Sequence, residues 1–371
     1  MKILGTLFRW LFAILLMLLV VALLVGHAWL QAAFLTLAVA GLLFWPMKYL
    51  SARWNQTTAS WSRLGFVLAM LAGFMVIPSG TKDTIYRSEK HRKAILDIYD
   101  KKVAKWPADV EDIYVETDYG KVHVLACGKP ENPPVLLLHA ASMGAPSWAE
   151  NLPPLLDHFR IFAIDNIGEG NKSELKNAMV FPLTPKELAD LYAGIADSLG
   201  VERCPVFGAS NGGFIAMNLA YYYPEKVESL LLMGPMGLTQ ISNKSILTMA
   251  LSSMYPFPFV RKYTTRFAIG DDPGVLEKYG DWFDAIISGS IPSIAQPVPM
   301  TTAQKQAMSL PVLLFLGTKD PIVGDAAFAK ETAGDFPTIQ IEVLESGHLV
   351  GVEKASYVNA VVASFFDFEE N

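Results

Sequence analysis

A glycine-rich turn between a strand and a helix restricts the fold of this 371-residue chain more than any other feature. The apolar run Cys204–Phe207 leads into the hexapeptide GASNGG at 208–213, and the helical run Phe214–Tyr223 follows. Gly-x-Ser-x-Gly in this setting predicts a sharp turn that holds a serine hydroxyl above the end of a sheet. Glycines are expected there because side chains would collide with the neighbouring helix and strand. We therefore predict that Ser210 is a nucleophile.

Short β-rich runs alternate with helical patterns from Asp112 to the C-terminus. They predict strands at 112–117, 120–127, 134–139, 160–165, 204–209, 229–234, 311–317 and 339–344. The first two, joined by Tyr119-Gly120, indicate an antiparallel hairpin. The later ones are continuously apolar, as are parallel strands buried on both faces. The sequence thus predicts an α/β fold with a mostly parallel eight-stranded sheet and helices on both faces.

Two residues on loops after later strands could activate the serine. A serine hydroxyl is a weak nucleophile until a base accepts its proton. His348 follows the last predicted strand, and we expect it to be that base, with a surface loop histidine as the alternative. Asp320 follows the preceding strand and could orient the imidazole. It could instead be a turn residue before Pro321. Along the chain the three residues come in the order Ser, Asp, His. This order is typical of enzymes whose serine nucleophile lies on a strand-to-helix turn.

A tetrahedral intermediate also needs backbone N–H groups that point at its oxygen. One donor is expected from Asn211, the residue after the nucleophile. The other is expected from the loop after Leu138, where Ala140 or Ala141 could serve. Of the two we favour Ala141. His139 is expected to anchor this loop and not to take part in catalysis.

From about Asp112 onward, roughly 70% of the chain, the sequence resembles the α/β-hydrolase superfamily. The segment 165–173, DNIGEGNKS, is similar to the D-x-x-G-x-G-x-S loop that follows the fourth strand in that superfamily. Within it, the chain most resembles bacterial lidded carboxylesterases. The resemblance implies a catalytic core at 112–234 and 311–371. One departure is Ala140, where most members have glycine.

The nucleophile and a long insertion indicate the reaction class. Serine at position 210 argues against dehalogenases and epoxide hydrolases, which use aspartate. The segment 235–310 is rich in aromatic residues and methionine, and we expect it to be a helical lid inserted after the sixth strand. Its large apolar residues could line a pocket or only pack the lid onto the core. They are Met254, Tyr255, Phe257, Phe259, Tyr263, Phe267, Trp282 and Phe283.

We therefore predict a serine hydrolase that cleaves small-molecule carboxylic esters through an acyl-enzyme on Ser210. Lipophilic or lipid-like esters are favoured. An acyltransferase or a peptidase with the same triad is an alternative, and a non-catalytic binding or receptor protein on the same fold is another. No cluster of His, Cys and Asp has metal-ligand spacing, and no dinucleotide-binding motif follows a strand, so neither metal nor organic cofactor is expected.

An apolar N-terminal quarter predicts a membrane anchor. No charged residue lies between Arg9 and Lys48, a run nearly twice the ~20 residues that one membrane-spanning helix needs. We expect two transmembrane helices in 10–47, a third if 64–81 also spans, and an amphipathic connecting helix in 82–111. A cleaved signal peptide is the alternative. The interpretation is a multi-pass protein of a bacterial cell membrane, with the side of the catalytic part left open by conflicting charge signals.

Charge divides the chain in the same way. Residues 1–106 carry a net charge of +9 and the remainder −15, within a total of −6. A basic first part and an acidic second part suit a protein held against an anionic lipid bilayer. Nothing in the pattern indicates a nucleic-acid surface. The two cysteines, Cys127 and Cys204, lie in apolar strand-like runs, which predicts buried thiols.

Overall fold

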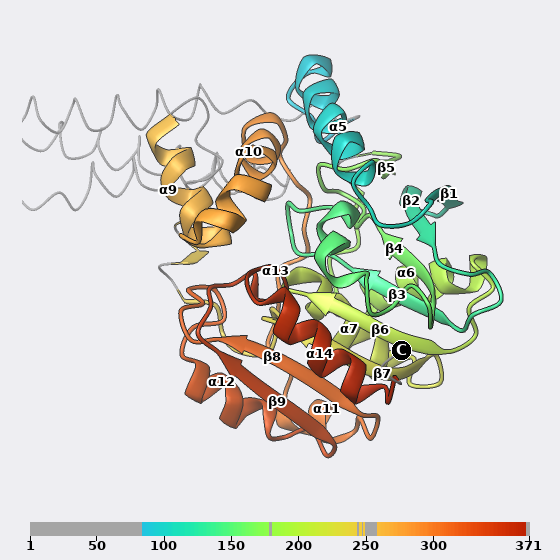
Figure 1. Cartoon of the computed structure of the whole chain (residues 1–371). Helices are drawn as coiled ribbons and strands as arrows, with labels where there is room; N and C mark the ends of the chain where they lie inside the picture. Colours follow the sequence, from blue (N-terminus) through green and yellow to red (C-terminus); the bar gives the residue numbers. More distant parts are fainter. Residues whose placement is uncertain (1–83, 178–179, 243–244, 247, 249–257, 369–371) are drawn as a thin grey trace, which may run out of the picture. The chain divides into compact units, whose positions relative to one another are not determined.

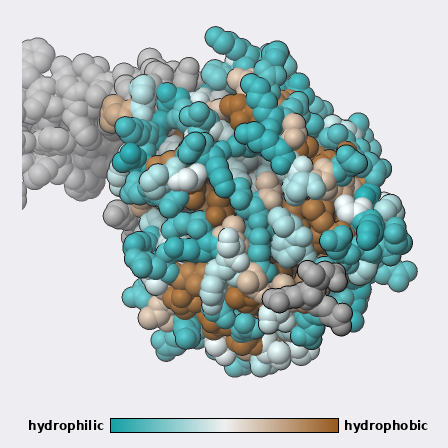
Figure 2. Space-filling view, in the orientation of Figure 1, coloured by the Kyte–Doolittle hydropathy of each residue, from teal (hydrophilic) through white to brown (hydrophobic). Residues whose placement is uncertain are grey.

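In the computed structural model of the chain, the described residues are 84–177, 180–242, 245–246, 248 and 258–368. Their strands form one sheet, with helices against both of its faces (Figure 1). Figure 2 shows one face of the molecule, on which hydrophilic residues predominate and hydrophobic residues gather in small areas.

The sheet has nine strands. They are β1 (Glu111–Glu116), β2 (Gly120–Cys127), β3 (Pro134–Leu138), β4 (Arg160–Ile164), β5 (Glu174–Leu175), β6 (Cys204–Ala209), β7 (Val227–Met233), β8 (Val312–Gly317) and β9 (Ile339–Leu344). The order is β1-β2-β4-β3-β6-β7-β8-β9, with β5 paired to β2. From β4 to β9 every neighbouring pair is parallel, whereas β2 is antiparallel to each of its partners.

All eight predicted strands are present, with ends within two residues of the prediction. The two-residue strand β5 has too short a pattern to be predicted. The mostly parallel sheet and the antiparallel first hairpin are confirmed. Leu138 pairs with Gly208, and Gly208 pairs with Leu232, so the carboxyl ends of β3, β6 and β7 meet at one edge of the sheet.

Helices cover both faces because strand side chains alternate between them. The helical elements are α5 (Glu89–Val103), the 3₁₀ helix η1 (Ala145–Asn151), α6 (Pro185–Ser198), α7 (Asn211–Tyr222), α9 (Pro258–Ile269), α10 (Pro273–Gly289), α11 (Thr302–Gln306), α12 (Ala326–Ala333), α13 (Val350–Glu353) and α14 (Ala355–Phe365). Leu136 and Leu138 of β3 belong to a core cluster with α6, α7 and α12. Val135 and Leu137 belong to a second cluster with α5, η1, α10 and α14.

The helix predicted within 82–111 is observed as α5. Ser88 caps it, its side chain accepting a hydrogen bond from the His91 N–H. Ile95 and Tyr99 are fully buried, and α5 packs against α10. The segment 235–310 contributes α9, α10 and α11 where it is described. Its function as a lid stays a prediction.

The membrane localisation predicted from the sequence is contradicted. Among the helices of the described ranges, none is long and apolar enough to cross a bilayer. The stretches on which that prediction rested, 10–47 and 64–81, lie outside the described residues. A lipid bilayer as a partner is likewise not supported, because that prediction rested only on the hydropathy and charge pattern of the sequence.

Candidate active site

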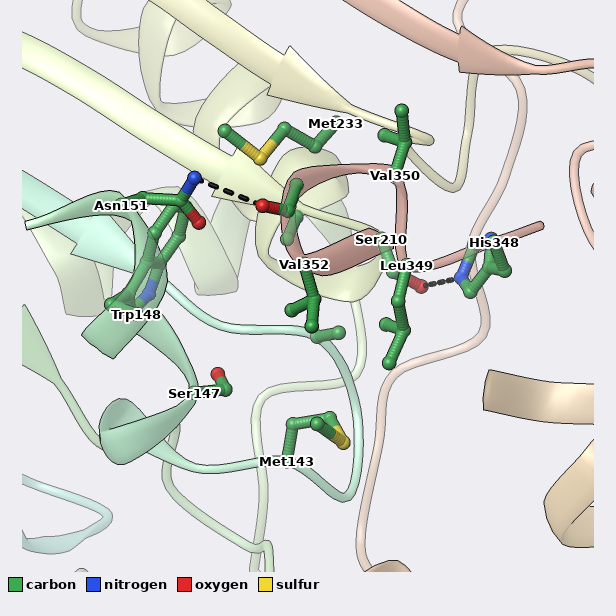
Figure 3. A pocket seen from close by; sticks show the side chains of 13 residues that line it. Met143, Ser147, Trp148, Asn151, Ser210, Met233, His348, Leu349, Val350 and Val352 are labelled. Carbon is green, nitrogen blue, oxygen red and sulfur yellow. Dashed lines mark hydrogen bonds between the residues drawn. The ribbon is translucent and has the colours of Figure 1, made fainter. Parts of the chain in front are cut away.

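Three residues far apart in the sequence meet at the carboxyl edge of the sheet. Ser210 lies between β6 and α7, Asp320 follows β8, and His348 follows β9. The Ser210 Oγ lies 2.7 Å from Nε2 of His348, and Nδ1 of His348 lies 2.7 Å from Oδ2 of Asp320. Figure 3 shows the contact between the serine and the histidine. All three side chains are buried, so the predicted nucleophile, base and acid form one hydrogen-bonded line.

The turn at Ser210 is strained in the way its sequence predicts. Ser210 has φ of 49°, a left-handed conformation that non-glycine residues rarely adopt. Its N–H donates to the Met233 carbonyl and its carbonyl accepts from the Met236 N–H. A Cβ at Gly212 would lie 2.0 Å from the Leu138 carbonyl oxygen, and one at Gly208 would lie 2.5 Å from the Gly212 oxygen. Close packing against β3 and within the turn therefore requires these glycines.

Asp320 serves the turn and the histidine at once. Its Oδ1 accepts hydrogen bonds from the backbone N–H groups of Ile322 and Val323, at 2.7 and 3.0 Å. Its Oδ2 faces Nδ1 of His348. Asp320 can therefore both form the turn and orient the histidine, which were alternatives in the sequence analysis. A Cβ at Gly317 would lie 2.2 Å from the Gly347 oxygen, so glycine there allows the His348 loop to approach β8.

The two predicted oxyanion donors follow the neighbouring strands β3 and β6. Asn211 begins α7, and Ala141 lies in the loop after β3. Neither backbone N–H has a hydrogen-bond acceptor within the part of the chain that the structure describes. Ala140, the alternative donor, lines the cavity beside Ser210. The choice of Ala141 over Ala140 stays a prediction.

His139 anchors the loop after β3, as expected. Its Nε2 accepts a hydrogen bond from the Asn166 N–H at 2.8 Å, and its Nδ1 lies 2.8 Å from the Ala140 carbonyl oxygen, which can accept the ring N–H. Burial lowers the pKa of His139, which keeps the ring uncharged. Its ring is fully buried.

A small cavity opens beside the serine, between η1 and α13 (Figure 3). Its walls are mainly apolar, with two polar side chains from η1. The lining includes Met143, Ser147, Trp148, Asn151, Met233, Leu349, Val350 and Val352. None of these was predicted to line a pocket, because most of them lie in or next to η1 and α13, which are too short for a recognisable pattern.

The aromatic residues of 235–310 do not line this cavity where they are described. Trp282 and Phe283 are buried in the core cluster that contains α5. Phe259 and Tyr263 are exposed, and Phe267 packs against the other cluster. The packing alternative is therefore correct for Trp282, Phe283 and Phe267. The remaining three, Met254, Tyr255 and Phe257, lie outside the described residues.

A buried charged network fixes the loop after β4. Oδ2 of Asp165 accepts from the Tyr99 hydroxyl at 2.8 Å and lies 2.8 Å from Nδ1 of His123. His123 Nε2 contacts Asp112 at 2.7 Å. Burial would raise the pKa of Asp165, but the bond and charge of His123 outweigh it and hold the pKa below its usual range. The network ties this loop to α5 and β1. Of this network, the sequence analysis had identified only Asp165, the first residue of the D-x-x-G motif.

Glu169, in the same loop, is a buried acid that the sequence analysis left without a role. Its carboxyl group contacts Ser142 and Asn211, on either side of the candidate oxyanion site. Burial raises its pKa to about 8. An ionisable residue between the two glycines of the loop was the signal that could have marked it.

Both cysteines are buried and unpaired, as predicted. Burial raises the pKa of the Cys127 thiol to about 11 and that of Cys204 to about 12, so neither is a reactive thiolate at neutral pH. The described residues contain no group of three or more His, Cys, Asp or Glu side chains placed to hold a metal ion.

A family model described as alpha/beta hydrolase fold matches residues 133–258. Together with the strand order, this match decides the fold class. The chain has the α/β-hydrolase fold. This confirms the α/β-hydrolase fold and superfamily resemblance expected from the sequence, but not the transmembrane helices predicted before the core.

Proteins from Bacillus subtilis are similar to this chain over nearly their whole length. Carboxylesterase YbfK is 29% identical over 287 residues, which are 72% of this chain and 91% of that protein. An uncharacterised carboxylesterase, nap, is 27% identical over 292 residues, 73% of this chain and 91% of its own. The prediction of a serine hydrolase of the carboxylesterase type agrees with both.

Solved structures give the same result. The crystal structure of carboxylesterase CesB (YbfK) from B. subtilis has a TM-score of 0.68 and 26% identity, covering 75% of this chain and 98% of its own. The structure of naproxen esterase from the same organism also has a TM-score of 0.68 and 26% identity, covering 76% of this chain and 99% of its own.

Proposed function

We propose that this chain hydrolyses carboxylic esters through an acyl-enzyme on Ser210. The single observation that carries the proposal is the hydrogen-bonded line from Ser210 Oγ through His348 to Asp320. A buried serine in contact with a base, which is itself oriented by a carboxylate, is the arrangement that nucleophilic catalysis needs. Similarity to two B. subtilis carboxylesterases supports the ester as the substrate class.

Each group has a definite role in this mechanism. His348 Nε2 takes the proton of the Ser210 hydroxyl while Oγ attacks the ester carbonyl carbon, and the C=O electron pair moves to the oxygen. The N–H groups of Asn211 and Ala141 donate to that oxyanion. His348 then returns the proton to the departing alcohol oxygen, which leaves an acyl-Ser210. A water molecule, deprotonated by His348, then attacks the acyl carbonyl carbon. His348 returns the proton to Ser210 Oγ as the acyl–oxygen bond breaks, which releases the carboxylic acid product and restores the serine.

Asp320 stays ionised throughout and holds the N–H of His348 Nδ1. This bond fixes the tautomer in which Nε2 can accept the serine proton, and it stabilises the imidazolium that forms. The two backbone bonds to Oδ1 keep the carboxylate from turning away.

The cavity favours an ester with an apolar part. Met143, Met233, Leu349, Val350 and Val352 supply most of its wall, and burying apolar substrate surface there is favourable at about 25 cal/mol per Å². We infer a lipophilic ester of modest size. The segment 235–310, which contributes α9, α10 and α11 where it is described, is proposed to act as the lid over the core.

A comparison of the wild type with Ser210→Ala tests the proposal. Purified protein is assayed with p-nitrophenyl esters of rising acyl length, and folding is checked by thermal melting. We expect the wild type to hydrolyse these esters. In Ser210→Ala the rate should be lower by a factor on the order of 10⁴ or more, with an unchanged melting temperature. Activity in Ser210→Ala close to that of the wild type would refute the mechanism. Transfer of the acyl group to an added alcohol in preference to water would instead indicate an acyltransferase.

A further inference from the structure

One buried carboxyl group joins the two segments that carry the proposed oxyanion donors. Glu169 lies between β4 and β5 and is 2% exposed. Its Oε2 accepts a hydrogen bond from the Ser142 N–H at 2.5 Å, and Ser142 is next in sequence to Ala141. Asn211 donates from its side-chain Nδ2 to Oε1 at 3.3 Å. A single side chain thus connects the loop after β3 to the first residue of α7.

The contact to Ser142 falls where the backbone is strained. Ser142 has φ of 59°, in the left-handed region that serine seldom occupies. Such conformations persist only where the surroundings hold them. The hydrogen bond from Ser142 N–H to Glu169 is one of these restraints, and it fixes the peptide plane between Ala141 and Ser142. The direction of the neighbouring Ala141 N–H depends on that backbone path.

We propose that Glu169 is a positioning residue for the oxyanion hole, and that its protonated, uncharged form is the one that supports hydrolysis. The inference rests on the ester hydrolysis proposed above. Glu169 acts through Ser142 and Asn211 and makes no contact with the reacting atoms in this scheme.

Burial, with a smaller contribution from the charge of Asp165, raises the pKa of Glu169 and favours its neutral form. The ionisable side chains of its cluster are Asp165 on its own loop, which is paired with His123, His139 after β3, and Tyr192 on α6. Asp165 is anionic, whereas burial lowers the pKa of His139 and raises that of Tyr192, so both are uncharged at neutral pH. An ionised Glu169 would add a second negative charge close to a developing oxyanion, where repulsion is little screened.

The Asn211 amide can bond to either protonation state of Glu169. Its Oδ1 is buried and has no hydrogen-bond partner among the described residues. The oxygen and nitrogen of an amide exchange places by rotation about its last torsion. After that rotation a protonated Glu169 can donate its O–H to the amide oxygen, whereas an ionised carboxylate cannot. A protonated Glu169 can therefore keep a hydrogen bond to Asn211, with Nδ2 in the buried position that Oδ1 occupies here.

The test compares Glu169→Gln and Glu169→Ala with the wild type on p-nitrophenyl butyrate between pH 6 and 10, corrected for spontaneous hydrolysis. Glutamine keeps an uncharged group that can accept from Ser142 and bond to Asn211, but it does not titrate. We expect kcat/KM of the wild type to fall above about pH 8, as Glu169 ionises. Glu169→Gln should stay within about threefold of the wild type at pH 7 and lose the alkaline fall. In Glu169→Ala, kcat should fall about 10- to 100-fold with little change in KM.

Glu187→Gln is the matched control, because Glu187 also accepts backbone N–H groups but does so at the exposed start of α6. It should keep the wild-type profile. If Glu169→Ala does not fold, the pH profile of Glu169→Gln decides alone. An alkaline fall that persists in Glu169→Gln would overturn the inference, and so would an unchanged kcat in folded Glu169→Ala. Failure of the proposed function itself is recognised separately, by activity in Ser210→Ala.

Discussion

Gly351 lies against Met233 so closely that a Cβ at position 351 would stand 2.3 Å from the methionine Sδ. Both residues line the cavity beside Ser210, and the Gly351 carbonyl accepts a hydrogen bond from the Asn151 side chain at 3.0 Å. This contact joins α13, the helix after His348, to the end of β7. The size of the cavity therefore depends on the absence of a single methyl group.

Gly351→Ala should narrow the cavity and discriminate against larger acyl groups. The methionine side chain has to move, and such overpacking costs about 1–3 kcal/mol of stability. We expect kcat/KM for p-nitrophenyl butyrate to fall several-fold more than that for the acetate. An equal fall for both esters, measured with matched enzyme concentrations, would show that this wall does not contact the acyl chain.

Asp320→Asn should be severe although it preserves shape. The backbone N–H groups of Ile322 and Val323 hold the amide oxygen at the Oδ1 position, so the amide NH2 group faces Nδ1 of His348. The imidazole is then driven to the tautomer with its proton on Nε2, which cannot take the serine proton. A loss on the order of 10⁴-fold in kcat is expected. Asp325→Asn, the same change at the N-cap of α12, is the control and should be nearly silent. If Asp320→Asn is also silent, another carboxylate orients His348.

The pKa of Glu169 also predicts how stability depends on pH. Its pKa is raised by burial to about 8, above the 4.5 of an unperturbed glutamate. Between these two values the unfolded chain has released a proton that the folded chain still holds, so the free energy of unfolding falls as pH rises. Glu169→Gln removes this loss, which is on the order of a few kcal/mol.

The melting temperature of Glu169→Gln, relative to that of the wild type, should therefore increase from pH 5 to pH 9 by about 5 °C or more. Glu187→Gln is again the control, because hydrogen bonds from Thr184 and Leu183 lower its pKa and its contribution is constant across this range. A difference between Glu169→Gln and the wild type that does not change with pH would mean that Glu169 does not titrate there.

The parts of the fold with strong local signals could be predicted from the sequence. The strands are long apolar runs, and the turn around Ser210 needs glycines whose neighbours are fixed by the strand-to-helix path. His348 and Asp320 could be placed because each directly follows a strand, so topology brings them to the same edge. Each of these features can be recognised from a short stretch of neighbouring residues.

The missing parts depend on distant partners. Glu169 gains its role from Ser142 and Asn211, 27 and 42 residues away, and no local pattern reveals that pairing. The cavity is formed by two short helical elements that meet only after folding. The aromatic residues of 235–310 were suggested as pocket lining because composition cannot distinguish a lid's inner face from its packing surface. The hydropathy of the N-terminal quarter likewise predicted a membrane localisation, but no described helix is long and apolar enough to cross a bilayer.

Covalent capture of the nucleophile tests the central claim most directly. The protein is treated with a fluorophosphonate, and the modified residue is identified by intact-mass and peptide mass spectrometry. We predict one adduct per chain, located at Ser210, and none in Ser210→Ala or after heat denaturation. Labelling that persists in Ser210→Ala, or an adduct on another residue of the folded wild type, would contradict the assignment of Ser210 as the nucleophile.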